Sequence, residues 1–306
     1  RRKPNFFIMI IKIFSLLVLI SIMSAQNTFS GLSAWTHGGT VGYSGGGYLF
    51  SFQNAFRNAA MLVDAERTVQ LSLVRYPAEV NAQSAIINGK IKDHHLGFAI
   101  NNINYGIFES RTADNVLTGS FSANDTHIQI GYGRFIYKDK IIAGLISGLF
   151  FSQLEKTNAS LITMSPSALL RATHFTAAIT IEHYGKVLDS YTSRSEHLSP
   201  SVVFSLHRAL NRYPLELEFV SASSGDTDKR VYRVSALYQP YDNLYFKGGV
   251  SSNRLDRISG DQLRRNLFND MGFGVGYAFD NIIIDCNTFT YSDSHSIFSI
   301  AISSKF

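Results

Sequence analysis

Hydrophobic and polar residues alternate along most of the chain, and the alternation is clearest in the stretch 295–306. There the large apolar side chains stand at even positions: Phe298, Ile300, Ile302 and Phe306. The odd positions are mostly small or polar. A period of two residues is typical of a β-strand whose two faces meet different surroundings. A soluble sandwich could hold such a strand, but a last strand that stops on an aromatic residue is typical of a transmembrane β-barrel. We therefore expect these four residues to face lipid and to form the signal that the barrel insertion machinery reads.

The same period recurs from Arg67 onwards and predicts about fourteen strands. Leu215, Leu217 and Phe219, for example, alternate with Glu216 and Glu218. The expected strands lie near 68–76, 82–91, 94–105, 127–137, 140–153, 159–171, 173–183, 197–208, 213–222, 230–239, 242–252, 267–278, 281–291 and 295–306. Charges on these strands have to face a wet or internally paired lumen, because a charge facing lipid costs about 2–4 kcal/mol at the membrane midplane. The predicted fold is all-β, an antiparallel barrel of the outer-membrane type.

The connections between the expected strands differ in length at the two ends. Junctions after even-numbered strands are tight: Lys138-Asp139, Ala209 to Arg212, Pro240-Tyr241 and Phe279-Asp280. Connections after odd-numbered strands are long and polar: 106–126, 184–196, 223–229 and 253–266. Short periplasmic turns and long outer loops are typical of outer-membrane barrels. Arg171-Ala172-Thr173 has little turn chemistry, so the strand count around 159–183 stays open.

The N-terminal part of the chain follows other patterns. Four basic residues, an apolar run over 13–22 and small residues at Ser24 and Ala25 predict a cleaved signal peptide over 1–25. A membrane anchor is the alternative, although the run is about half the roughly 20 residues that a helical span needs. We expect an irregular segment or plug over 26–66, with a short helix or an untidy first strand within 51–66. The barrel would then occupy 67–306.

Composition narrows the function classes. The whole chain has 28 basic and 23 acidic residues, and removal of the signal peptide takes four basic ones, which leaves a net charge near +1. A nucleic-acid partner is therefore not indicated. Cys286 is the only cysteine, so no disulfide within the chain or CxxC metal site is expected. After the signal peptide no run of about 18 apolar residues occurs, which excludes a bundle of membrane helices.

Candidate catalytic and cofactor motifs are weak. Asp93-His94-His95 is a tight cluster, but neighbouring strand residues point to opposite faces, so a turn is expected there instead of a metal site. The glycines of 272–276 suggest a dinucleotide loop but lack a strand–turn–helix context. No serine lies in a recognisable nucleophile motif. We expect no cofactor, no metal and no enzymatic activity, with a surface-located membrane enzyme as a minor alternative.

Two stretches of the chain resemble the PorV/PorQ family of outer-membrane proteins, and the PorQ branch in particular. The first is Asn58-Ala59-Ala60-Met61-Leu62, which stands where the family shows Asn-Pro-Ala. The second runs over 98–134; its matching positions are Tyr105, Gly106, Phe108, Gly119, Phe121, Ala123, Asp125, Gly131, Tyr132 and Arg134. The alanine in place of the proline departs from the pattern, and dense matching covers about residues 55–155.

The resemblance implies a role in type IX protein secretion in Bacteroidetes-like bacteria. Members assist the secretion or surface attachment of cargo, so the implied partners are translocon components and cargo C-terminal domains, besides outer-membrane lipid. The family fold is similar to that of fatty-acid transporters, and the alternative function is therefore a channel for hydrophobic small molecules. Which cargo or substrate is handled, the oligomeric state and the state of the lumen do not follow from the sequence.

Overall fold

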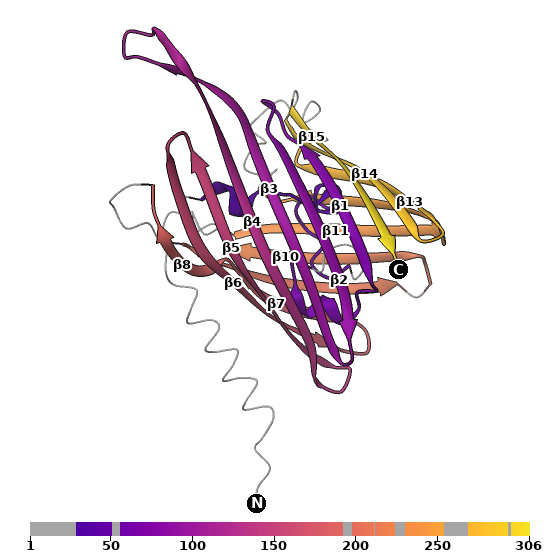
Figure 1. Ribbon diagram of the computed structural model, residues 1–306. Helices are drawn as coiled ribbons and strands as arrows, with labels where there is room; N and C mark the ends of the chain where they lie inside the picture. The colour runs from indigo at the N-terminus through magenta and orange to yellow at the C-terminus, as the bar shows by residue number, and fades with distance from the viewer. Residues whose placement is uncertain are drawn as a thin grey trace, which may run out of the picture.

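The computed structural model describes residues 29–50, 56–191, 198–210, 212–223, 230–253, 269–292 and 295–306. Its strands form one antiparallel sheet that closes on itself (Figure 1). Neighbouring strands pair in chain order, and β1 pairs with β15 to close the barrel. The strands are β1 Thr68–Arg75, β2 Asn81–Ile91, β3 His94–Arg111, β4 Leu117–Tyr137, β5 Ile141–Leu154, β6 Thr157–Arg171, β7 Thr176–Glu182, β8 Tyr184–Asp189, β9 Ser201–Leu210, β10 Leu215–Ser223, β11 Arg230–Tyr241, β12 Leu244–Ser251, β13 Met271–Phe279, β14 Ile282–Ser292 and β15 His295–Lys305.

Strands β7 and β8 together occupy one position in the barrel wall. Both pair with β6, and the register between them slips by one residue at His183, whose φ is +57°. A non-glycine residue with positive φ is typical of an irregularity that re-aims a strand. Beyond it, β9 pairs with β7, and none of the described strands pairs with the other edge of β8. The barrel thus has fourteen strand positions, one of them interrupted, which confirms the predicted all-β barrel.

The two faces of the wall differ in chemistry. Outward side chains are large, apolar and exposed; on β15 these are Phe298, Ile300 and Ile302, with Phe306 just after the strand. Inward side chains are buried and often polar, as Ser299 on β15 and Glu218 on β10 are. An apolar outside around a polar inside matches a barrel in lipid. Within the described residues, no helix is both long and apolar enough to cross a membrane. The protein is a membrane-spanning barrel of the bacterial outer membrane.

The prediction of a loop between the third and fourth strands is wrong. The segment 106–126, predicted as a long polar connection, is largely strand, because β3 continues to Arg111 and β4 begins at Leu117. The two strands form a hairpin that reaches well beyond the rest of the barrel (Figure 1). The segment 184–196 also begins as strand, over β8. The three connections that stay long, 190–200, 224–229 and 252–270, each join strands whose ends lie at the same end of the barrel as this hairpin.

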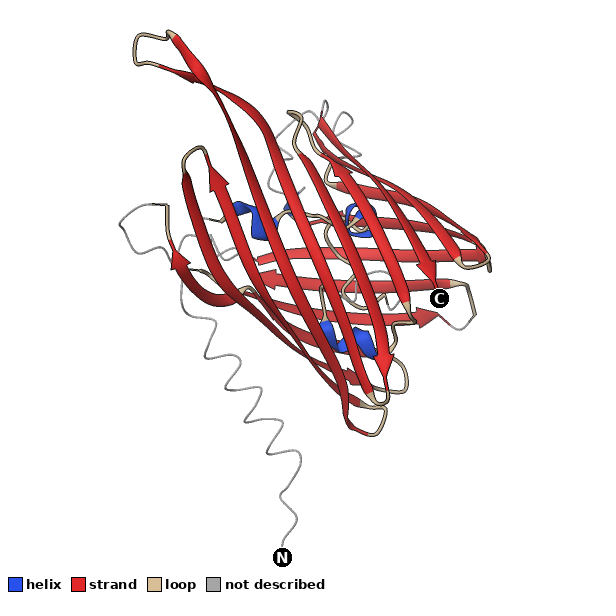
Figure 2. Cartoon of the chain, viewed as in Figure 1, coloured by secondary structure: helices blue, strands red, loops and turns tan. Residues whose placement is uncertain are grey.

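The described N-terminal residues, 29–50 and 56–66, lie inside the barrel (Figure 2). They contain the 3₁₀-helix η2 Ser30–Ser33, the short α-helix α2 Gly38–Gly42 and the 3₁₀-helix η3 Ala59–Val63. We call the described residues 29–50 and 56–66 the plug. Helix α2 packs on β12 to β15 and β1, whereas η3 packs on β3 to β6. The helix expected over 51–66 is thus only the short turn η3 among the described residues, and the expected signal peptide lies outside them.

Candidate binding cavity beside the plug

Backbone groups of the plug are bound by a buried carboxylate of the wall. Glu218, on the inner face of β10, accepts hydrogen bonds from the backbone N–H of Gly47 and, at 2.7 Å, of Leu49. From within the plug, Arg57 donates to the carbonyl oxygens of Gly45 and Gly46 at 2.6 and 2.8 Å, and to the Tyr48 hydroxyl. Charge-assisted bonds of this kind are stronger than neutral ones. The irregular stretch 45–49 therefore has a defined conformation without any regular secondary structure.

At the short-turn end, η3 fits against wall positions that have no side chain. A Cβ atom on Gly144 would meet the backbone of Ala59 and Ala60, and one on Gly133 would lie 2.7 Å from the Ala59 carbonyl oxygen. Ala60 N–H donates to the Ser167 hydroxyl of β6 at 3.1 Å. Glycine inside a strand is typical of such close approach by another segment. These contacts fix η3 against the inner face of the wall near the end where the turns are short.

The other half of the plug rests on a buried ion pair. Lys247 of β12 and Asp285 of β14 are 2.8 Å apart, and the Lys247 ammonium also lies over the Tyr43 ring. Helix α2 is bound to β15 through the Ser299 hydroxyl, which donates to the Gly38 carbonyl oxygen at 3.0 Å. Because the lysine and the aspartate are both buried, removal of one would leave an uncompensated charge. The pair therefore helps to hold this half of the plug against the wall.

A cavity of about 350 Å³ remains between the plug and the wall. It lies towards the end with the long connections, because the wall residues that line it there are the first of β9 and β11 and the last of β10. Its lining mixes aromatic with charged side chains. They include Trp35, Phe56, Arg57, Phe150, Glu182, His183 and Arg233.

His37 of the plug is a neutral donor at the cavity edge. Its Nδ1 lies 3.0 Å from the Ser84 hydroxyl, and that hydroxyl already donates its proton to the Thr36 carbonyl oxygen. His37 Nδ1 must therefore carry the hydrogen, and its Nε2 is the unprotonated nitrogen. Burial, and to a smaller degree the charge of Arg57, lowers the pKa of His37 to about 4.

Most polar groups on the cavity wall have partners. Glu182 accepts from the Tyr48 hydroxyl at 2.8 Å, and His127 Nε2 lies 2.8 Å from the Thr163 hydroxyl. Asp125 accepts from Tyr105 at 2.7 Å and also from Ser152. In the described part of the chain, no three His, Cys, Asp or Glu side chains lie close enough to hold a metal ion.

No protein-family model matches the chain, and no curated protein matches it either. Several solved barrels are similar to it in fold. The toluene transporter TbuX of Ralstonia pickettii aligns over 90% of this chain and 100% of its own, with a TM-score of 0.60 and 13% identity. A FadL homologue of Pseudomonas aeruginosa aligns over 89% and 98%, with a TM-score of 0.54 and 11% identity. The toluene transporter TodX of P. putida aligns over 81% and 92%, with a TM-score of 0.51 and 11% identity.

The structure brings part of the family-like motif together. Asn58, Ala59 and Ala60 begin η3, and the Asn58 side chain accepts from Ala60 N–H. A Cβ on Gly131 would lie 2.9 Å from the Leu62 side chain, so Gly131 is another wall position against which η3 packs closely. Its neighbours on β4, Tyr132 and Arg134, point outward instead.

The other motif residues lie on the β3–β4 hairpin. Tyr105 points inward to Asp125, Gly106 has a φ of +90° where the register of β3 shifts, and Phe108 stacks on Phe121 beyond the barrel. They are therefore well away from η3 along β3.

His94 and His95 occupy opposite faces, as their alternation requires. His94 is exposed and its Nδ1 lies 2.8 Å from the Tyr132 hydroxyl, whereas His95 is buried. The residues that the sequence did not single out are Trp35 and His183, which the fold assembles with Arg233 around the cavity. Arg233 faces the lumen, as its place among apolar alternate positions of a strand predicts.

Proposed function

We propose that this protein is an outer-membrane channel for small molecules with a hydrophobic body, and that the plug controls passage through it. The cavity between plug and wall carries this proposal. It lies at the long-connection end, which faces outward in barrels of this kind. A solute from outside would reach this cavity first, and η3 would bar its way to the periplasm. The cavity is also within the size range of small-molecule sites.

The similar solved structures support the same class of function. Two of them are named as toluene transporters and one as a FadL homologue, and each aligns with most of this chain. At 11–13% identity they establish the fold alone, so the substrate class is carried over here as a proposal. The proposal assigns no catalytic step to the chain.

Uptake of a neutral aromatic solute tests the channel. Cells that lack such a transporter should take up radiolabelled benzyl alcohol faster once the protein is in their outer membrane. Glu218→Ala should raise the rate further, because two backbone N–H groups of the plug lose their acceptor. Glu216→Ala is the matched control, since Glu216 is on the same face of β10 but bonds to His207. Uptake no faster than in cells without the protein would refute the proposal.

A second candidate function, assistance to type IX secretion, is favoured by the β3–β4 hairpin. Polar side chains on the outer face mark the edge of the lipid-facing band; Asn102 donates to Thr126 at 2.9 Å, and Asn124 donates to Gln153 at 3.3 Å. Beyond them the ribbon becomes apolar again. Ile107 is 79% exposed and Leu117 is 57% exposed. At about 3.3 Å per residue, Ile107 lies roughly 20 Å beyond the last lipid-facing residue of β3, Ile100.

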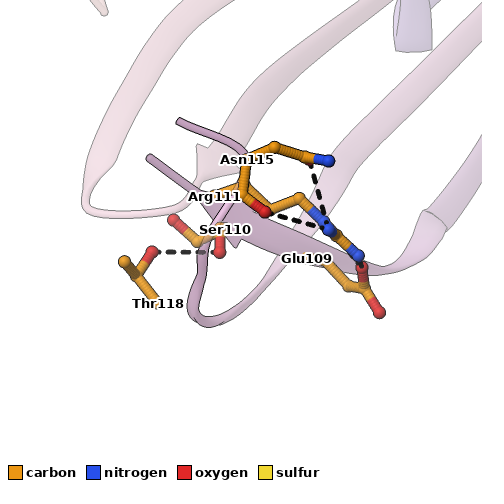
Figure 3. A network of polar contacts seen from close by, with 5 residues as sticks. All are labelled: Glu109, Ser110, Arg111, Asn115 and Thr118. Carbon is orange, nitrogen blue, oxygen red and sulfur yellow. Dashed lines mark hydrogen bonds and ion pairs between the residues drawn. The ribbon is translucent and has the colours of Figure 1, made fainter. Parts of the chain in front are cut away.

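The hairpin also has free strand edges and a fixed tip. Residues 105–111 of β3 extend past the end of β2, and residues 117–121 of β4 extend past the end of β5. At the tip Arg111 binds Glu109 at 2.7 Å and the Asn115 carbonyl oxygen at 3.2 Å (Figure 3). An ordered ribbon with unpaired edges suits the addition of an extended peptide strand. The resemblance to the PorV/PorQ family points to secretion components or cargo as that peptide.

Cross-linking in native membranes tests this candidate. A photoreactive residue at Ile107 should capture translocon components or cargo C-terminal domains, and one at the lipid-facing position Ile130 should not. Ile107→Ser with Leu117→Ser should abolish the capture while the barrel still assembles. Capture of neither kind of partner from Ile107 would count against the secretion role and leave the channel proposal as it stands.

A further inference from the structure

Arg233 is the one charged side chain on the cavity wall whose partner is missing from the described residues. It lies on the inner face of β11, between the outward-facing Tyr232 and Val234. No described residue accepts a hydrogen bond from its guanidinium or forms an ion pair with it, and its Nε is buried without a partner. Leaving a charge in a protein interior without a hydrogen-bonded partner is costly. The guanidinium therefore retains unused binding capacity for an anion.

Glu182 and Glu218 attract Arg233 electrostatically, but both carboxylates are hydrogen-bonded to other groups, as the other charges near the cavity are. Arg57 is engaged by two carbonyl oxygens and a hydroxyl of the plug. Glu218 is occupied by backbone N–H groups, and Glu182 accepts from Tyr48. Asp125 accepts two hydroxyl protons. Among the described residues, Arg233 is thus the cation that still has free donors for an incoming anion, and a guanidinium can bind a planar carboxylate through two parallel bonds.

Apolar surface lies beside this cation. A Cβ built on Gly45 of the plug would lie 3.0 Å from Arg233 Nε and 2.7 Å from the Trp35 ring, so the guanidinium and the indole approach the same point. Phe56 and Phe150 line the same cavity. One end of the site therefore suits a negative charge, and the rest suits a flat apolar body.

We propose that the cavity binds a compact organic carboxylate, with its charge on Arg233 and a single-ring apolar body against Trp35. This inference rests on the proposed channel function and names its preferred substrate class, a charged one in place of a hydrocarbon. The volume of about 350 Å³ accommodates one ring with a short substituent. The plug closes the cavity on one side, so a long extended chain does not fit within it.

Trp35 provides the assay, because it is the only tryptophan in the chain and lines the site itself. Its fluorescence should change as benzoate is titrated into the purified full-length protein. Benzyl alcohol, which has the same ring without the charge, should bind at least tenfold more weakly. Arg233→Gln should remove this preference, and Arg233→Lys should restore part of it. Arg134→Gln is the matched control, since Arg134 is exposed on the outer face of β4.

The outcomes separate this inference from the channel proposal. A preference for benzoate that depends on Arg233, with unchanged heat-modifiable migration of each variant, supports it. Equal binding of benzoate and benzyl alcohol, with uptake of both, overturns the carboxylate inference and leaves the channel proposal intact. An unchanged preference in Arg233→Gln also overturns it. Failure of both solutes to bind and to be taken up overturns the two together.

Discussion

His37 links the seating of the plug to pH. Its folded pKa of about 4 lies below the ordinary value of 6.5, so between these values the unfolded chain binds a proton that the folded chain does not. The contribution of neutral His37 to the free energy of unfolding is therefore fully present above pH 6.5, and it is lost as the pH falls towards 4. The loss at pH 5 should be on the order of 1–2 kcal/mol.

The temperature at which the folded gel band disappears measures this effect at pH 7.5 and at pH 5. The downward shift should shrink in His37→Gln, which cannot take up the proton. His94→Gln, a change at an exposed histidine, should keep the full shift. An equal shift in His37→Gln and the unmodified protein would show that other groups cause it.

Gly144 tests the close approach of η3 to the wall. Gly144→Leu would place a side chain where the backbone of Ala59 and Ala60 now lies, so η3 would have to move. Overpacking of this kind costs about 1–3 kcal/mol. We expect faster proteolysis within the plug and a lower temperature for loss of the folded band. Gly248→Leu is the control, because a Cβ there meets nothing within 4 Å; the same result for both variants would contradict the prediction.

At the scale of single elements, β15 joins the two ends of the sheet. It pairs with β14 along one edge and with β1 along the other, and Phe306 N–H donates to the Arg67 carbonyl oxygen at 3.1 Å. If Phe306 is part of the insertion signal, its deletion should reduce the fraction of protein that reaches the membrane in heat-modifiable form. Phe279→Ala changes an exposed aromatic residue at the same rim and should insert normally. Normal insertion without Phe306 would remove the signal role.

The alternation predicted some strands well and others poorly, and the difference has a physical cause. Strand β1 keeps one register with both of its neighbours along its whole length, and β15 does so with β1, so their side chains alternate without interruption. The pattern fails where the register shifts. At Gly106 the irregularity in β3 places Ile107 and Phe108 next to each other as exposed residues, and the hairpin resembles a polar loop. At His183 the register slips between β7 and β8, so the alternation predicts a strand that ends there and a loop after it, although the two strands occupy one position in the wall.

The set of residues that line the cavity could not be predicted from the sequence, for another reason. Arg233, His183 and Trp35 come from β11, the β7–β8 junction and the plug, and only the closed barrel brings them to one cavity. Alternation assigns each residue to a face of its own strand, and so predicts that Arg233 points inward. It gives no information about which inward residues lie opposite one another. The lumen chemistry is therefore a property of the whole molecule.

The whole molecule is a barrel with the plug inside it, and the proposed transport requires these two parts to move relative to each other. Cysteines at Gly38 and Ala301, in a Cys286→Ser background, test this requirement. The Cβ atoms would be 3.1 Å apart, whereas they are about 3.8 Å apart on average in disulfides, so α2 would have to shift by a few tenths of an ångström. The disulfide would bind α2 to β15. Benzyl alcohol uptake should then fall to that of cells without the protein, and a reductant should restore it. Each single cysteine variant should transport normally, because it cannot form the link. Undiminished uptake in the fully cross-linked protein would mean that solutes pass a stationary plug.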